Sequence, residues 1–406
     1  MKIVVLKFGG TSVGTTKKIK KVVEIIASYK KKNYKVIVIS SAMSGVTNDL
    51  IKKSSEISDD FSDSEHDVLV SSGEQMACSL IAGGLIHKGY KSRSWLSWQV
   101  PIITVGPYKN SRINQISKNK IINYLKDGGI PIISGFQGVN NENRITTIGR
   151  GGSDASAIMV AKFFKAKRCI IYTDVEGVYT TDPNKLKKAK KIKEISYEEM
   201  LEMASLGAKV MQPVSIQDAR LNRIDIEVRS SYIKKKGTLI TKRSNIISNK
   251  IVTGISSTQN DSKVSLIGVK DKPGVAAAIF KPLSKNSINV DMVVQNISAN
   301  GKETDLTFTI KTEDLNKTKK IIQQNKKINF RKLLFERNVS KISVIGVGMI
   351  TTPGVTFRMF QTLADKKINI KVISTSEIKI SVLIDNKDTK KALTSLHKEF
   401  KLDQHK

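Results

Sequence analysis

The stretch MKIVVLKFGGTSVGTTKK (1–18) starts with an apolar run, turns through a pair of glycines and continues as a helical pattern. A strand, a glycine loop and a helix N-terminus in this order are typical of an α/β fold that holds a phosphate. The spacing of Gly9 and Gly14 is close to that of a P-loop, but Thr15 and Thr16 stand where a P-loop has Lys and Ser or Thr. The stretch alone leaves a phosphate site and an ordinary turn open.

The same alternation of apolar runs and helical periodicity continues through residue 245. It predicts an α/β fold with a mostly parallel sheet and helices on both faces. Ligands of such folds bind at the carboxyl ends of the strands, where glycines and polar residues cluster in this sequence. We expect strands within 2–8, 35–43, 129–136, 168–175 and 224–231, and helices around 19–29 and over 47–57, 66–88, 111–126, 153–164, 196–205 and 214–221.

The composition is that of an ordinary globular protein. Hydrophobic residues make up 39% and charged residues 26% of 406, a length that suits two or three domains. No run approaches the ~18 apolar residues of a membrane span, and the N-terminus lacks a signal-peptide pattern, so we expect a cytoplasmic protein without a membrane partner. Cys78 and Cys169 lack the spacing of a disulfide framework or a metal site, which predicts buried, inert thiols.

The net charge of +33 is unusual and could indicate a nucleic-acid partner. The excess is mostly lysine and is spread along the chain, and the runs at 185–193 and 234–236 contain no aromatic residues that would stack on bases. A general compositional bias explains the charge better than a basic patch does. We therefore expect no nucleic-acid partner.

The C-terminal part of the chain contains an internal repeat, in which residues 264–295 match residues 342–374. Each copy predicts the order βαββαβ, a small α+β sandwich that the chain uses twice. Gly274 opens a helix beside Asp271, and a helix N-terminus can bind a carboxylate, which suits an amino-acid ligand. Duplication without a function is the alternative.

Several segments after the predicted strands carry residues suited to an anionic ligand. In GRGGSDASA (149–157), Arg150 can clamp a carboxylate and the following glycines offer backbone donors, while Asp154 could cap the helix or orient lysines around a phosphate. Glu74 lies in an apolar helical stretch, where a solvent-facing position is the plainer interpretation and a bound ammonium group the other. Thr47 begins a second glycine-loop helix, in which it could also be an ordinary cap.

These residues are more informative together than singly. Lys7, Arg150 and Lys209 could gather around a phosphate with Asp154 between them. The four histidines form no metal-ligand cluster, and no Ser-His-Asp arrangement is present. Phosphoryl transfer depends mainly on positioned cations and hydrogen-bond donors, which is what this set supplies.

The order of the motifs resembles that of the aspartate kinase family, within the amino-acid kinase superfamily. The resemblance covers nearly the whole chain and rests on KFGGTS (7–12), SAMSGVTNDL (41–50), SGEQ (72–75), GFQGV (135–139), TTIGRGGSD (146–154), YTDVEGVYTTDP (172–183), EISYEEMLEMASLGAKV (194–210) and two C-terminal ACT units with DKPG, INVDMVVQN and ISTSEIKISV. It implies an amino-acid kinase domain at 1–245, a first ferredoxin-like ACT domain at 263–336, and a second one formed by 249–258 and 340–402.

The resemblance implies that ATP, with Mg²⁺, phosphorylates the β-carboxylate of L-aspartate to 4-phospho-L-aspartate, the first step toward lysine, threonine and methionine. Lys7 and Asp154 would be catalytic. The substrate would contact Thr47, Glu74, Arg150, Gly151, Gly152 and Ser153, and the nucleotide Lys7, Phe8, Gly9, Gly10, Thr173, Asp174, Tyr179, Asp182, Pro183 and Lys209. The sequence identifies no Mg²⁺ ligands.

The resemblance also implies feedback control by lysine, threonine or both, bound between ACT units of paired chains. The effector site would comprise Asp271, Asn289, Val290, Asp291 and Gln295. In the second repeat Lys371 stands where the first has Asp291, so we expect the first repeat to bind the effector.

The chain ends just after the second repeat, and no Met lies between Met211 and Met292. We expect a monofunctional homo-oligomer, a homodimer through its ACT domains, without a separate regulatory subunit. The alternatives are another amino-acid kinase acting on glutamate or acetylglutamate, an inactive amino-acid sensor on the same scaffold, and a basic nucleic-acid binder.

Overall fold

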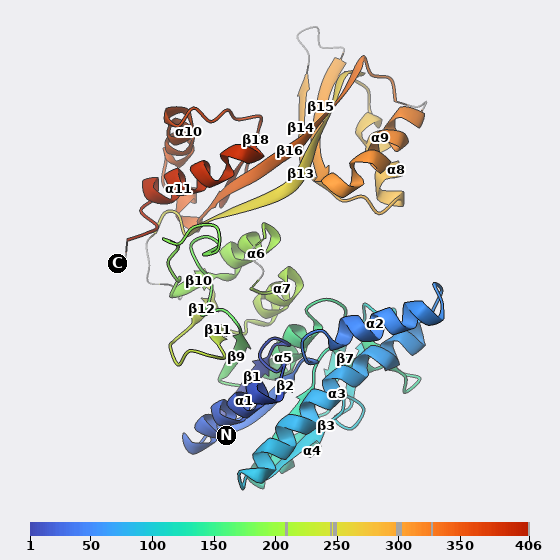
Figure 1. Cartoon of the computed structure of the whole chain (residues 1–406), viewed down its shortest axis with the longest axis vertical. Coiled ribbons are helices and arrows are strands. Elements are labelled where there is room, and N and C mark those ends of the chain that lie inside the picture. Colours follow the sequence, from blue (N-terminus) through green and yellow to red (C-terminus); the bar gives the residue numbers. More distant parts are fainter. Residues whose placement is uncertain (208–209, 244–245, 247–249, 298–302, 326–327, 405–406) are drawn as a thin grey trace. The chain divides into compact units, whose positions relative to one another are not determined.

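The computed structural model describes residues 1–207, 210–243, 246, 250–297, 303–325 and 328–404. The chain forms two compact units (Figure 1), unit 1 with residues 1–179 and 191–248 and unit 2 with residues 180–190 and 249–406. The chain thus leaves unit 1 after Tyr179 and returns to it at Lys191. The boundaries of the three domains expected from the sequence are not tested by this division into two units and stay a prediction.

Unit 1 is built on an eight-stranded sheet with the order β10-β12-β11-β9-β1-β2-β6-β3. Every pair of neighbours is parallel except β11 with β12, which confirms the predicted mostly parallel sheet. Its strands are β1 (Ile3–Phe8), β2 (Lys35–Ser40), β3 (Ser92–Trp95), β6 (Ile130–Ser134), β9 (Arg168–Thr173), β10 (Glu194–Ser196), β11 (Ile226–Ser230) and β12 (Thr238–Thr241). All six residues of β1 are buried, as expected for a central strand covered on both faces.

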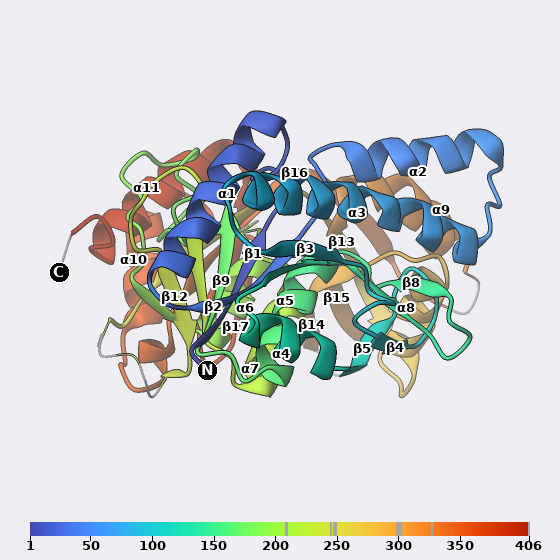
Figure 2. The ribbon, with the colours of Figure 1, turned by 90° about the horizontal axis from the view of Figure 1, so that it is seen from below.

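The helices of unit 1 cover both faces of this sheet. They are α1 (Thr16–Lys31), α2 (Val46–Ile57), α3 (Asp63–His87), α4 (Asn119–Lys126), α5 (Gly152–Phe163), α6 (Tyr197–Ser205) and α7 (Pro213–Asn222). Figure 2 shows α1 and α3 on one side of β1 and β3, and α5 and α7 on the other. The core joins the predicted apolar face of α1 to β1 and α3.

A small four-stranded sheet with the order β5-β4-β7-β8 lies beside the large one. Its strands are β4 (Ile102–Val105), β5 (Arg112–Ile116), β7 (Gln137–Val139) and β8 (Ile145–Thr147). The predicted helix over 111–126 is wrong in its first half, because β5 pairs antiparallel with β4 and the helix begins only at Asn119. The spacing of Ile113 and Ile116 fits a helix, whereas the pairing that makes this segment a strand comes from elsewhere in the chain.

Among the described helices, α3 alone is long and apolar enough by composition to cross a membrane. Half of its most apolar window is buried inside the structure, and its buried residues include Asp67 and Glu74. These are the features of a core helix. Cys78 on α3 and Cys169 on β9 are free and buried, which confirms their predicted burial. Burial raises the pKa of both thiols and so disfavours the reactive thiolate.

Unit 2 contains a six-stranded sheet with the order β14-β15-β13-β16-β18-β17. The elements in chain order are β13 (Gly254–Lys270), α8 (Val275–Lys285), β14 (Val290–Ile297), β15 (Glu303–Lys311), α9 (Leu315–Gln324), β16 (Lys332–Ile345), α10 (Val355–Asp365), β17 (Val372–Thr375), β18 (Lys379–Asp385) and α11 (Thr389–Glu399). Gly274 and Gly354 are the N-caps of α8 and α10, with φ of 90° and 89°. The Pro-Gly turn therefore has the same backbone conformation in both repeats. The two repeats bury separate hydrophobic cores.

The first part of β13 belongs to the second repeat. Residues 254–258 pair with residues 341–345 of β16, and Ile255 lies in the core of the second repeat. The remainder of β13 pairs with β15 of the first repeat. This pairing is the one that an insertion of the first repeat into the second requires.

Candidate active site

The carboxyl ends of β1, β2, β6 and β9 meet at one edge of the large sheet. Phe8 at the end of β1 lies opposite Ser40 of β2 and Tyr172 of β9. The loops that follow are joined by backbone hydrogen bonds, from Gly9 N to Tyr172 O and from Gly135 N to Ser40 O. Side chains that leave these strands at their ends are therefore brought together, as the fold class predicts.

Lys7 and Asp154 meet at this edge. The Lys7 ammonium, on β1, lies 2.6 Å from Oδ1 of Asp154, in the first turn of α5, and both residues are 8% exposed. Two buried charges need such a partner, because either one alone would lose its hydration without compensation. A Cβ on Gly9 would lie 3.5 Å from the ammonium, so the glycine loop passes close beside this charge.

Glu74 lies on the buried side of α3 and is 3% exposed. Its Oε1 accepts a hydrogen bond of 3.0 Å from Ala42 N, whereas Oε2 is buried without a partner among the described residues. Burial raises the pKa of Glu74 to about 7, although the Ala42 N–H and the Lys7 ammonium lower it. The solvent-facing position that its sequence window favours is wrong, because this part of α3 is covered by the β2–α2 loop.

Glycines let the loops of the site approach closely. A Cβ on Gly73 would lie 2.8 Å from the Ala42 Cβ, and one on Gly10 would lie 3.0 Å from Ala42 O. A Cβ on Gly135 would lie 3.1 Å from Ser153, at the start of α5. Larger residues at these positions would separate the loops and spread the charged groups apart.

The loop after β1 and the start of α5 offer backbone donors to an anion. The N–H groups of Gly10 and Ser153 have no hydrogen-bond partner among the described residues. Free N–H groups at a helix N-terminus favour negative charge, and the Lys7 ammonium adds to that preference. The arrangement can therefore hold a phosphate, which the sequence of the first glycine loop left open.

Arg150 lies in the turn between β8 and α5 and is exposed. The glycines on both sides, Gly149 and Gly151, have φ of 78° and 79°, a backbone conformation that other residues adopt with strain. Ser215 of α7 donates a hydrogen bond to Gly151 O and fixes the end of the turn. The Arg150 guanidinium itself makes no ion pair with a described residue.

Asp67 is a buried polar residue that the sequence interpretation missed. It is 0% exposed on α3, seven residues before Glu74, and hydrogen bonds link it to Lys109 and Thr147. The sequence did contain a sign of its burial: Asp67 is a second acidic residue in the apolar helical stretch of Glu74, and the spacing places Asp67 and Glu74 on one face of the helix.

The remaining predicted substrate and nucleotide residues are placed as follows. Thr47 is in the first turn of α2 and is half-buried, and Phe8 is buried and stacked on Tyr172, with 4.9 Å between ring centroids. Thr173 at the end of β9 donates a hydrogen bond to Asp174. Tyr179 is the last residue of unit 1 before the chain leaves it, Asp182 and Pro183 are exposed in unit 2, and Lys209 lies outside the described residues.

The predicted effector residues lie in the first repeat of unit 2. Asn289, Asp291 and Gln295 are exposed on or beside the edge strand β14, Val290 is half-buried, and Asp271 is exposed near Gly274. Asp291 forms an ion pair with the buried Lys341. Lys371, its counterpart in the second repeat, forms ion pairs with Glu336 and Asp385.

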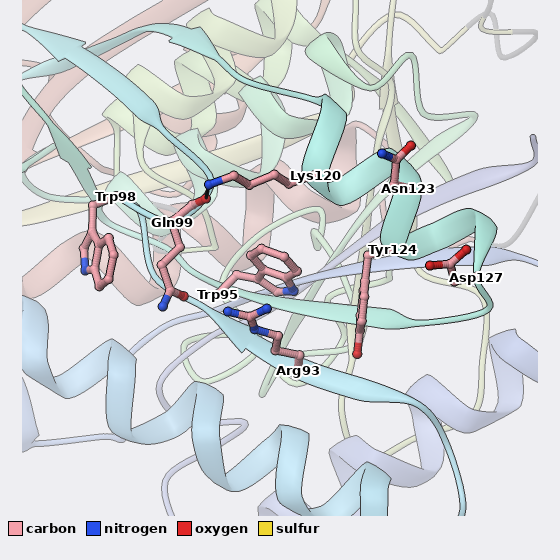
Figure 3. Close-up of a pocket in the computed structure, with 8 residues that line it drawn as sticks. All are labelled: Arg93, Trp95, Trp98, Gln99, Lys120, Asn123, Tyr124 and Asp127. Atoms are coloured by element: carbon pink, nitrogen blue, oxygen red, sulfur yellow. Dashed lines mark hydrogen bonds between the residues drawn. The ribbon is translucent and has the colours of Figure 1, made fainter.

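A hollow of about 530 Å³ on unit 1 does not contain any of these residues. It is lined by Arg93, Trp95, Trp98, Gln99, Lys120, Asn123, Tyr124 and Asp127, around β3 and α4 (Figure 3). Arg93 lies over the Trp95 ring, with 4.3 Å to its centroid. The converging groups at the strand ends, rather than this hollow, are the candidate active site.

No group of three or more His, Cys, Asp or Glu residues that could hold a metal ion occurs in the described part of the chain. Mg²⁺ is usually held by one or two carboxylates together with substrate phosphates and water. The residues present fit a metal that arrives with a nucleotide better than one in a cage of protein ligands.

Comparison with known proteins agrees with this fold. Residues 2–230 match the amino acid kinase family, and residues 264–325 and 342–400 each match the ACT domain. The fold and the site thus define a kinase of the amino acid kinase class, a phosphotransferase, with two C-terminal ACT domains. The predicted fold class and repeat are confirmed.

The chain is 41% identical over 406 residues to aspartokinase 2 of Bacillus subtilis (strain 168), and the match covers 100% of this chain and 99% of that relative. It is 42% identical over 402 residues to an aspartokinase of Geobacillus stearothermophilus, and this match covers 99% of this chain and 98% of the relative. The structure of E. coli aspartokinase III in complex with lysine and aspartate matches with a TM-score of 0.81 at 25% identity, over 98% of this chain and 100% of that one. The chain belongs to the aspartokinase family.

Proposed function

We propose that the protein transfers the γ-phosphoryl group of ATP to the β-carboxylate of L-aspartate and forms 4-phospho-L-aspartate. The observation that carries this proposal is the buried Oε2 of Glu74, which has no described partner and lies at the same strand edge as the Lys7–Asp154 pair. A buried carboxylate oxygen of this kind is compensated when a ligand ammonium group binds to it. The relatives named as aspartokinases support aspartate as the acceptor.

In this proposal Glu74 holds the ammonium group of aspartate and Arg150 its α-carboxylate, with Thr47, Gly151, Gly152 and Ser153 beside them. The β-carboxylate then points toward the phosphoryl group that it attacks. A bidentate arginine and a buried acid fix both ends of the amino acid, which reduces the entropy lost on the way to the transition state.

Lys7 stabilises the negative charge that spreads over the transferring phosphoryl group, and the Gly10 N–H donates to the same oxygens. Asp154 holds the Lys7 ammonium in place between turnovers. Such preorganised donors do most of the work in phosphoryl transfer, because there is little covalent chemistry for the protein to do. The nucleotide contacts Phe8, Gly9, Thr173, Asp174, Tyr179, Asp182, Pro183 and Lys209. A Mg²⁺ ion that arrives with the nucleotide would neutralise part of the phosphate charge.

The proposal includes feedback control by lysine, threonine or both at the first ACT repeat. A structure of the E. coli relative contains lysine, and the two matched ACT domains of this chain support feedback control of this kind. A homodimer formed through the ACT domains, a place at the first step toward lysine, threonine and methionine, and a cytoplasmic location belong to the same proposal.

The test is hydroxamate formation from aspartate in the presence of ATP, Mg²⁺ and hydroxylamine. Lys7→Ala is expected to lower the rate about 10²–10³-fold, the usual effect of removing one preorganised donor. Lys2→Ala is the control, because Lys2 is an exposed lysine one residue before the same strand. A wild-type protein that phosphorylates glutamate but not aspartate, or an unchanged rate in Lys7→Ala, would refute the proposal.

A further inference from the structure

Three hydrogen bonds converge on the carboxylate of Asp67. Its Oδ2 accepts from Lys109 N at 2.9 Å and from Thr147 N at 2.8 Å, and its Oδ1 accepts from the Thr147 hydroxyl at 2.7 Å. The residue is 0% exposed. A buried carboxylate that accepts from two backbone N–H groups and one hydroxyl fixes the position of that backbone.

The two segments that Asp67 holds lie on either side of the turn that carries Arg150. Thr147 is the last residue of β8, three residues before Arg150, and its carbonyl accepts two hydrogen bonds from Ser111. A Cβ on Gly149 would lie 3.0 Å from Lys109 O, so the backbone at Lys109 is in direct contact with the residue before Arg150. The Asp67 carboxylate therefore fixes the positions of both the end of β8 and the loop at Lys109.

Asp67 and Glu74 are seven residues apart on α3 and both are buried. Seven residues are about two helical turns, which places both carboxylates on one face at a separation of about 10 Å along the axis. The helix itself is rigid at this distance. The helix therefore fixes the distance between Glu74, at one end of the candidate site, and Asp67, which holds the turn of Arg150 at the other end.

We propose that Asp67 is a positioning residue that sets the place of Arg150 relative to Glu74 and so selects an amino acid by its ammonium and α-carboxylate groups. This inference rests on the proposed function, in which Glu74 and Arg150 bind those two groups. Asp67 itself does not touch the substrate. It acts through Thr147, Lys109 and Gly149 on the turn that presents the guanidinium.

The test compares Asp67→Ala and Asp67→Asn with the wild-type protein in steady-state kinetics. Alanine leaves three donors without an acceptor, and we expect the KM for aspartate to rise roughly tenfold or more, with the KM for ATP and kcat at saturating aspartate within about threefold. Asparagine restores most of the affinity, because its amide oxygen can accept the two N–H groups while its NH₂ donates to the Thr147 hydroxyl. Ser71→Ala is the matched control, since Ser71 is 0% exposed on the same helix and its hydroxyl donates to the helix carbonyl of Val68.

A double-mutant cycle shows whether Asp67 acts through the arginine. In an Arg150→Ala background, Asp67→Ala is expected to raise the KM for aspartate less than twofold further. Independent, multiplying effects in the cycle, or a parallel rise of the KM for ATP in Asp67→Asn, would overturn the inference. If the wild-type protein used glutamate instead of aspartate, the proposed function would fail, and the same cycle measured with glutamate would still decide the role of Asp67.

Discussion

Buried charged groups distinguish the candidate site at the scale of single residues. Lys7 and Asp154 neutralise each other, and Asp67 is satisfied by three donors, whereas Glu74 keeps one oxygen without a described partner. An unsatisfied buried polar atom costs free energy and persists where a function compensates for it. We therefore expect Glu74 to lower the stability of the fold while it is required for binding the substrate.

Glu74→Gln is expected to abolish aspartate binding and to make the protein more stable above pH 7. The folded-state pKa of about 7 lies above the ordinary value of 4.5, so the folded protein binds this proton more tightly than the unfolded chain does. The contribution of Glu74 to the free energy of unfolding therefore falls as the pH rises from 4.5 to about 7 and stays low above it. Glutamine removes this loss of stability, on the order of 3 kcal/mol at pH 8, and the gain in the free energy of unfolding is measurable by urea unfolding.

The pH dependence of activity supplies the second half of this prediction. In the wild-type protein kcat/KM for aspartate should fall about tenfold for each pH unit below about 7, because the carboxylate must be ionised to bind an ammonium group. Glu56→Gln is a control, since Glu56 is an exposed glutamate on α2. A wild-type profile that stays flat between pH 5.5 and about 7.5 would contradict the assigned role of Glu74.

At the same scale, the sequence predicted that Lys7 and Asp154 lie close together, which the structure confirms, but it did not reveal the orientation of Glu74. Lys7 and Asp154 could be placed together because each directly adjoins a glycine loop at a strand end. The helix that carries Glu74 is apolar on several sides, so its periodicity does not reveal which face meets the β2–α2 loop. Asp67 was missed for the same reason, and its partners lie 42 and 80 residues away in the chain.

Among the elements, α3 approaches the β2–α2 loop closely at Gly73. Gly73→Ala is expected to lower the free energy of unfolding by about 1–3 kcal/mol and to raise the KM for aspartate. The added methyl group would lie 2.8 Å from the Ala42 Cβ and 3.2 Å from Val46, so the helix must move away from the loop that Glu74 binds. The measurements are urea unfolding and steady-state kinetics on the same preparations.

Gly83→Ala on the same helix is the matched control for this variant. A Cβ at Gly83 meets nothing within 4 Å, so the exchange should stabilise the protein by about 0.5–1 kcal/mol through helix propensity alone. Equal effects of the two exchanges would show that the close approach at Gly73 is unimportant.

In the large sheet, β1, β2, β6, β9 and β11 could be predicted from their apolar runs, whereas β3, β10 and β12 could not, and neither could the strands of the small sheet. The strands β4, β5, β7 and β8 have three to five residues each, and β5 is largely exposed. Segments so short show no clear alternation, and their pairing partners are distant in the sequence. The last strand of this sheet, β8, leads into the turn with Arg150. The strands that could not be predicted therefore include the one whose Thr147 binds Asp67.

For the whole molecule, the duplicated repeat allows its two halves to be compared directly. Both copies preserve the fold down to the positive φ of the Pro-Gly turn, yet their charged residues differ. Asp291 in the first repeat remains exposed, while Lys371 in the second is largely covered and has two acidic partners. An exposed acid with one ion-pair partner can still face the ammonium group of an amino acid, whereas a covered lysine held by two acids cannot.

Asp291→Asn is therefore expected to raise the lysine or threonine concentration for half-maximal inhibition at least tenfold, while Lys371→Met leaves it within about twofold. The reason is that the first exchange removes the charge which holds the effector ammonium, whereas after the second Glu336 keeps an ion pair with Lys263. Lys341→Met is the matched control, because it removes the internal partner of Asp291 and keeps the acid itself. The assay is aspartate phosphorylation with lysine and threonine added separately and together, and loss of inhibition in Lys371→Met alone would place the effector in the second repeat.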